Sequence, residues 1–162
     1  MSKSLFKKTT IALAVVGALT STVATAENFT FTADVTNFEV KIDSSGKVVS
    51  GLQESLIPTN VEDITISVAK NDSGNYAAQP IHFLENAKLS GRDIVLNNGD
   101  HSYTTINDTN EINGRNISMI SLTANGGEVT ASETLTLASH SEFKGDVLIN
   151  AKKLLKIGRA HV

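Results

Sequence analysis

The chain has 162 residues, of which 14 are basic and 17 acidic, and it contains no cysteine. An acidic balance argues against nucleic-acid binding, which requires basic patches. Without cysteine the protein has no disulfide, thiolate metal ligand or cysteine nucleophile. The length is sufficient for one domain with its own hydrophobic core.

The first 26 residues are typical of a signal peptide for export. Lys3, Lys7 and Lys8 precede the apolar run 11–19 (IALAVVGAL), and Ala24-Thr25-Ala26 is a small-residue cleavage site. The apolar run is shorter than the roughly 20 residues that a membrane-spanning helix needs. We therefore expect cleavage after Ala26 and passage through the periplasm. The remaining chain then carries 11 basic and 17 acidic residues.

The segment directly after this site has the pattern of a half-buried strand. Phe29, Phe31, Ala33 and Val35 alternate with polar residues, so they share one face of an extended chain. Two interpretations follow. The segment is either an ordinary first strand that pairs within its own domain, or a strand that is buried in another molecule by strand addition.

Apolar alternation resumes after Thr36-Asn37, but on even positions, which predicts a turn, a bulge or a new strand there. Further short strands are predicted at 63–69, 79–84, 93–96, 103–106, 116–124, 133–137 and 142–149. The turn residues at 97–100 could close a hairpin between two of them. Neither a long amphipathic helix nor a repeat of fixed period is visible, which disfavours a solenoid. Short strands separated by turns predict an all-β sandwich or barrel.

Both ends of the mature chain resemble one family. The start NFTFTADV is followed by the acid-to-glycine turn DSSG at 43–46. Near the other end, ETLTL at 133–137 precedes EFKGDVLI at 142–149. These motifs resemble the major subunits of chaperone–usher fimbriae, in particular the disulfide-free CS1/CFA/I-type (alpha) pilins.

The resemblance implies an immunoglobulin-like sandwich that lacks one strand and is completed by a donor strand. Residues 27–36 would be the donor extension and 37–156 the pilin domain. The donor anchors would be Phe29, Phe31, Ala33 and Val35. The acceptor groove would be lined by Phe38, Val40, Ile42, Phe143, Val147 and Ile149.

The function implied is that of a structural pilus subunit that polymerises by donor-strand exchange and supports adhesion. Its partners would be neighbouring subunits of the same kind, a periplasmic chaperone, an outer-membrane usher and a host receptor of unknown identity. The fimbrium on the cell surface would be its location. The alternative is a self-contained secreted β-sandwich module that binds carbohydrate or a host protein. Pairing of residues 29–35 within their own sheet would favour this alternative.

Catalytic and metal-binding patterns are weak, so we predict neither an enzyme nor a cofactor. His82, His101 and His140 lack metal-ligand spacing, and neither a Gly-x-Ser-x-Gly elbow nor a phosphate-binding glycine loop occurs. Residues 107–111 do not match a calcium loop and are predicted to form a solvated turn. Among the aromatic residues, Tyr76 and Tyr103 are the candidates for an exposed sugar-binding surface.

The last six residues, 157–162 (IGRAHV), read as the translation of a common sequencing-adapter stretch. We therefore expect them to be a scar and assign no role to Arg159 or His161.

Overall fold

The computed structural model describes residues 25–37, 39–69, 73–74, 80–97, 103–156 and 160–161. These residues form strands, turns and bends, so the prediction of an all-β fold is confirmed. No helix of the described segments has the length and apolar character needed to cross a membrane. Phe38 lies outside the described residues, as do Tyr76 and His101.

The strands differ widely in length, and the two longest have 16 residues each. In chain order they are β1 (Glu27–Ala33), β2 (Val40–Ile42), β3 (Lys47–Ser50), β4 (Gln53–Leu56), β5 (Val61–Val68), β6 (Ile81–Phe83), β7 (Lys88–Ser90), β8 (Asp93–Asn97), β9 (Thr104–Asn107), β10 (Glu111–Met119), β11 (Leu122–Leu137), β12 (Ser141–Lys156) and β13 (Ala160–His161).

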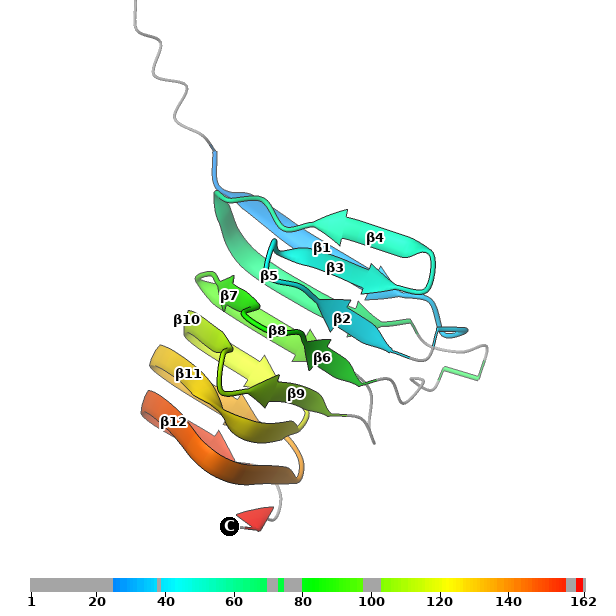
Figure 1. The fold of residues 1–162 in the computed structure, drawn as a ribbon. Coiled ribbons are helices and arrows are strands. Elements are labelled where there is room, and N and C mark those ends of the chain that lie inside the picture. The colour runs from blue at the N-terminus through cyan, green and yellow to red at the C-terminus, as the bar shows by residue number, and fades with distance from the viewer. Residues whose placement is uncertain are drawn as a thin grey trace, which may run out of the picture.

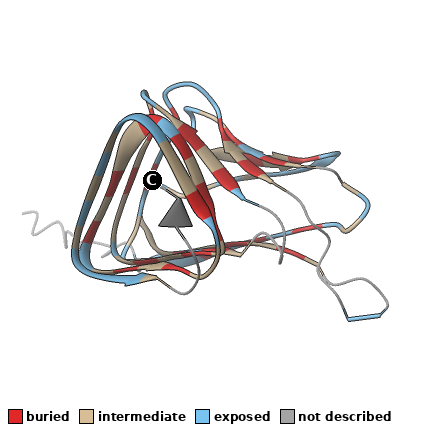
Figure 2. Ribbon diagram, turned by 90° about the horizontal axis from the view of Figure 1, so that it is seen from below, coloured by how far each residue is buried: buried red, intermediate tan, exposed pale blue. Residues whose placement is uncertain are grey.

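The chain winds into a stack of coils, which is a parallel β-solenoid (Figure 1). Seen along the stack, the coils are three-sided (Figure 2). The β1 face consists of β1, β5, β8 and the last residues of β10, β11 and β12. The β2 face consists of β2, β6, β9 and the first residues of β11 and β12. The β7 face consists of β7, the start of β10 and the middle of β11 and β12.

The immunoglobulin-like sandwich is not confirmed, because the strands pair in a different way. Such a sandwich is built from antiparallel sheets. Among the described strands, all the pairings between coils are parallel, and only the β2–β3 and β3–β4 pairs are antiparallel. Parallel neighbours require the chain to travel around a coil before it pairs again, and this gives a solenoid in place of two facing sheets.

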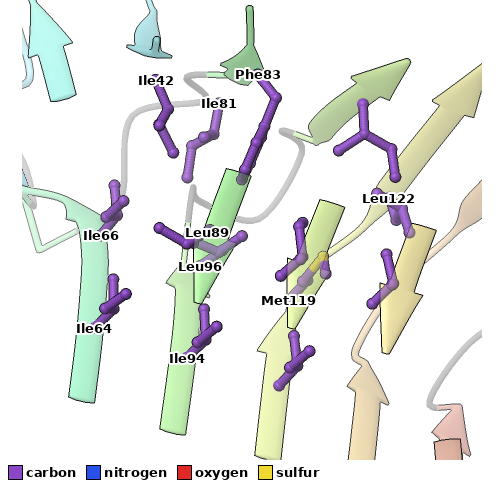
Figure 3. Packing of buried hydrophobic residues seen from close by; sticks show 14 of the residues in the cluster. Ile42, Ile64, Ile66, Ile81, Phe83, Leu89, Ile94, Leu96, Met119 and Leu122 are labelled. Carbon is purple, nitrogen blue, oxygen red and sulfur yellow. The ribbon is translucent and has the colours of Figure 1, made fainter. Parts of the chain in front are cut away.

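The core is a set of apolar columns, in which each inward side chain lies on its equivalent in the next coil (Figure 3). One column runs through all the coils: Phe29, Ile64, Ile94, Ile117, Leu135 and Leu154. The steps along it are 35, 30, 23, 18 and 19 residues. A repeat is therefore present, but its period shortens along the chain, which explains why no fixed period is visible in the sequence.

The chain turns between β1 and β2 and so passes from one face to another. The Asp34 carboxylate accepts hydrogen bonds from the backbone N–H and the hydroxyl of Thr36, and Asn37 N–H donates to the carbonyl of Asp34 over 3.0 Å. This turn explains the change of parity at Thr36-Asn37. The expected hairpin between 93–96 and 103–106 is wrong, because β8 pairs with β5 and β10 while β9 pairs with β6 and β11.

Candidate functional site

The four proposed donor anchors lie in the first coil of their own domain. β1 pairs in parallel with β5, with Phe29 opposite Ile64 and Phe31 opposite Ile66. Phe29, Phe31 and Ala33 are buried in the shared core, whereas Val35 is half-buried in the turn that follows β1. Each buried phenylalanine stabilises this coil by about 1.5–3 kcal/mol. The strand is thus an integral part of the described fold.

The residues proposed for the acceptor groove do not come together. Val40 and Ile42 are fully buried in β2, in the first coil. Phe143, Val147 and Ile149 are half-buried in β12, in the last full coil. The coils formed by β6, β9 and β11 separate β2 from β12 on the same face. The two groups therefore lie at opposite ends of the stack and line no common groove.

The outer side of the β2 face carries an aromatic and charged cluster. Tyr103, with 43% of its surface exposed, directly precedes β9 and meets His82 of β6 edge-on, with 6.3 Å between the ring centres. His82 Nε2 lies 3.6 Å from a carboxylate oxygen of Glu39, which also pairs with Lys41 Nζ over 2.8 Å. We call Glu39, Lys41, His82 and Tyr103 the Tyr103 cluster.

Parallel register explains why these residues meet. Lys41 lies opposite His82, and His82 lies opposite Thr105, so alternate outward positions of β2, β6 and β9 stand side by side. The Lys41 ammonium, and to a smaller degree His82, hold the pKa of the Glu39 carboxyl below its ordinary value. The cluster therefore presents a carboxylate, an ammonium group, an imidazole and an aromatic ring on one surface.

Comparison with known proteins assigns no family to this chain. No protein-family model, no curated protein and no solved structure matches it. The function of this chain therefore has to be inferred from its own residues and their geometry.

A second surface feature is an open hollow on the β1 face. It lies over β8, β10 and β11 and is lined by outward side chains that include Asp93, Asn116, Ser118, Thr134 and Thr136. Asn116 donates to the Asp93 carboxylate over 2.8 Å. That hydrogen bond, with the nearby Arg115 guanidinium, lowers the pKa of Asp93 below its ordinary value. The surface of the hollow is mainly apolar, with polar groups from Asp93, Asn116 and Ser118, and its lining includes no aromatic ring.

A row of ion pairs connects successive coils beside this hollow. Arg92 binds the carboxylates of Glu62 and Asp63, and Arg115 approaches the Asp93 carboxylate to 3.2 Å. In the last coil, Lys152 pairs with Glu133 over 3.0 Å. These groups satisfy one another between coils, so we interpret the row as structural.

Within the described residues, no group of three or more His, Asp or Glu side chains is arranged to hold a metal ion. His82 lies in β6, within the strand predicted at 79–84. The segment 107–111 forms a turn between β9 and β10, in which the Asn107 side chain accepts hydrogen bonds from Thr109. The side-chain oxygen of Asn107 is thus used within the turn.

Tyr103 could be named from the sequence as a candidate, but its partners could not. His82 is 21 residues away, and Glu39 and Lys41 are further still. Only the parallel register of β2, β6 and β9 brings them to one surface.

Proposed function

We propose that this chain is an exported, self-contained β-solenoid module that binds carbohydrate through the Tyr103 cluster. The observation that carries the proposal is an exposed tyrosine ring held beside an imidazole, a carboxylate and an ammonium group. Aromatic rings offer an apolar surface with a polar tip. Carboxylate and ammonium groups supply an acceptor and donors for sugar hydroxyl groups.

The position of β1 favours a self-contained module, and it does not favour a donor strand. Phe29 and Phe31 are already buried against β5. Withdrawal of β1 from its own sheet would therefore cost the burial free energy of both rings. Their pairing within the sheet favours the interpretation of this segment as an ordinary first strand of its own domain.

Donor-strand exchange in a fimbrium remains a second candidate function, because β1 is an edge strand with β5 as its one paired neighbour in the described residues. An edge strand is the element of a sheet that can leave with the smallest loss of pairing. Exchange would require β1 to separate from β5 and to be replaced there by the same segment of a neighbouring copy.

Binding to an array of neutral and acidic oligosaccharides tests the carbohydrate proposal. The expected result is binding to a defined subset of sugars, its loss in Tyr103→Ala and its retention in Tyr103→Phe, which keeps the ring. Glu39→Gln should weaken the same binding by about tenfold, the effect of a lost hydrogen bond to a charged group. If Tyr103→Ala binds the array as the unchanged protein does, the Tyr103 cluster is not the site.

Size-exclusion chromatography with light scattering separates the two candidate functions. The chain without residues 27–35 would be compared with the full chain, each with and without a peptide of residues 28–35. A stable full chain of low mass and a deletion that the peptide does not restore support the self-contained module. Mass ladders of the full chain, together with rescue of the deletion by the peptide, would establish donor-strand exchange.

A further inference from the structure

The outer side of the β2 face carries a ladder of polar side chains, with one residue from each of five neighbouring strands (Figure 1). Parallel register places opposite one another Lys41 of β2, His82 of β6, Thr105 of β9, Thr123 of β11 and Glu142 of β12. We call these five residues the β2-face ladder. Neighbouring strands lie about 4.8 Å apart, so the four steps from β2 to β12 span about 19 Å.

The two ends of the ladder carry the same kinds of groups. At one end, the Tyr103 cluster holds the Glu39–Lys41 ion pair, 2.8 Å long, beside an imidazole. At the other end, the Glu142 carboxylate pairs with Lys144 Nζ over 2.9 Å. The Lys144 ammonium, and to a smaller degree His140, hold the pKa of the Glu142 carboxyl below its ordinary value. Each end therefore offers a carboxylate and an ammonium group close to a histidine.

Polar and aromatic groups continue between these ends. Tyr103 directly precedes β9, the middle strand of the five, and 43% of its surface is exposed. Thr123 is half-buried and lies between Thr105 and Glu142. A threonine hydroxyl can both donate and accept a hydrogen bond. The surface that begins at the Tyr103 cluster therefore extends across the coils to Glu142.

We propose that the β2-face ladder binds a linear, neutral polysaccharide that lies across the coils. The Tyr103 cluster and the Glu142–Lys144 pair would be two subsites of one site. This inference rests on the proposed function and names the class of its ligand. Successive units of an extended glycan would meet successive strands. A single terminal sugar could contact only one of the two subsites, which lie about 19 Å apart.

The charges favour a neutral ligand. Both carboxylates of the site are paired with lysines of their own strands, so the two ion pairs contribute no net charge. The chain after the expected cleavage site carries 11 basic and 17 acidic residues. A protein with this excess of acids repels a polyanion at long range. An acidic polysaccharide is therefore a poorer ligand than a neutral one.

Isothermal titration calorimetry on the full chain tests the length of the ligand. The probes are cello-, malto- and chito-oligosaccharides from disaccharide to octasaccharide, with oligogalacturonates as acidic probes of equal length. We expect the affinity for one neutral series to rise at least tenfold from disaccharide to octasaccharide. The acidic octasaccharide should bind at least tenfold more weakly than the neutral one. Affinity that does not depend on length, tighter binding of the acidic series, or no binding of any neutral series would overturn the inference.

Glu142→Gln tests the second subsite. This variant should weaken binding of the neutral octasaccharide by about tenfold, the effect of a lost hydrogen bond to a charged group. It should leave the affinity for the disaccharide unchanged, which a general loss of structure would not do. The matched control is Glu111→Gln, since Glu111 pairs with Lys88 over 2.6 Å at the β7 face, away from the ladder. Equal octasaccharide affinities in the two variants would exclude Glu142 from the site.

The same titrations separate this inference from the proposed function. If Tyr103→Ala abolishes binding while the affinity does not depend on length or on Glu142, carbohydrate binding at the Tyr103 cluster stands and the extended site is wrong. If Tyr103→Ala binds every oligosaccharide as the unchanged protein does, the proposed function itself is wrong.

Discussion

The side chain of Asn110 connects its own turn to the preceding coil, since its Nδ2 donates to the carbonyl oxygen of Leu84 over 2.7 Å. The same amide nitrogen donates to the carbonyl of Ala87, and Asn110 Oδ1 accepts from the backbone N–H of Asn107. Asn110 is 1% exposed, so water cannot replace these bonds. One buried amide thereby satisfies three backbone groups at a corner of the solenoid.

Asn110→Ala should therefore lower the free energy of unfolding by at least about 2 kcal/mol, because a buried polar group left without a partner costs about 1–3 kcal/mol. Urea denaturation followed by circular dichroism measures the change. Asp108→Ala, at an exposed position of the same turn, is the control and should change the midpoint little. Equal midpoints for the two variants would show that the Asn110 bonds do not stabilise the corner.

Gly127 fits a corner at which a side chain has no room. Its φ is +94°, and a Cβ at this position would collide with the carbonyl oxygen of Asn107 in the coil before. Gly127→Ala should thus destabilise the protein by more than the cost of the backbone conformation alone, which is about 1 kcal/mol. Gly74→Ala is the matched control, since Gly74 has φ +77° but open space where the Cβ would stand. If both variants lose the same stability in urea, contact between the coils is not limiting at Gly127.

The same corner shows why the sequence indicated strands but not their arrangement. Asn125-Gly126-Gly127 has the composition of a hairpin turn. In the structure, Gly126 and Gly127 both have positive φ, yet the chain continues within β11 from the β2 face to the β7 face. A turn motif shows that the chain changes direction, but it does not distinguish reversal beside the previous strand from rotation around a corner.

Alternation of apolar residues was informative for a different reason. It depends on which side of a strand is buried, and this is the same in a sandwich and in a solenoid. The strand predicted at 63–69 thus corresponds to β5, with Ile64, Ile66 and Val68 buried. The partner of each strand depends on the coil length, which changes from 35 residues at Phe29 to 18 at Ile117 and so leaves no fixed period to find.

Thr104 is a polar residue inside an apolar column. It lies between Ile81 and Leu122, is fully buried, and its hydroxyl has no hydrogen-bond partner within the described part of the chain. Thr104→Val exchanges the hydroxyl for a methyl group of similar size and should raise the free energy of unfolding by about 1 kcal/mol. Thermal and urea unfolding measure the gain. Thr136→Val, at a half-buried outward position of β11, is the control. A loss of stability in Thr104→Val would mean that the hydroxyl finds a partner in solution.

Acid should weaken the contacts between coils, and Asp93 shows the sign of the effect. The hydrogen bond from Asn116, followed by the charge of Arg115, lowers the pKa of Asp93 below its ordinary value of 3.8 in the folded protein. A carboxyl with a lowered folded pKa stabilises the protein above its unfolded pKa, and this contribution is lost as the pH falls through the folded pKa. The urea midpoint should therefore decrease as the pH is lowered below about 4.

Asp93→Asn should reduce this decrease, because the variant has no carboxyl to protonate. Asn116→Ala should reduce it as well, since the largest cause of the lowered pKa is removed. An unchanged pH profile in both variants would exclude Asp93 as a source of the acid sensitivity.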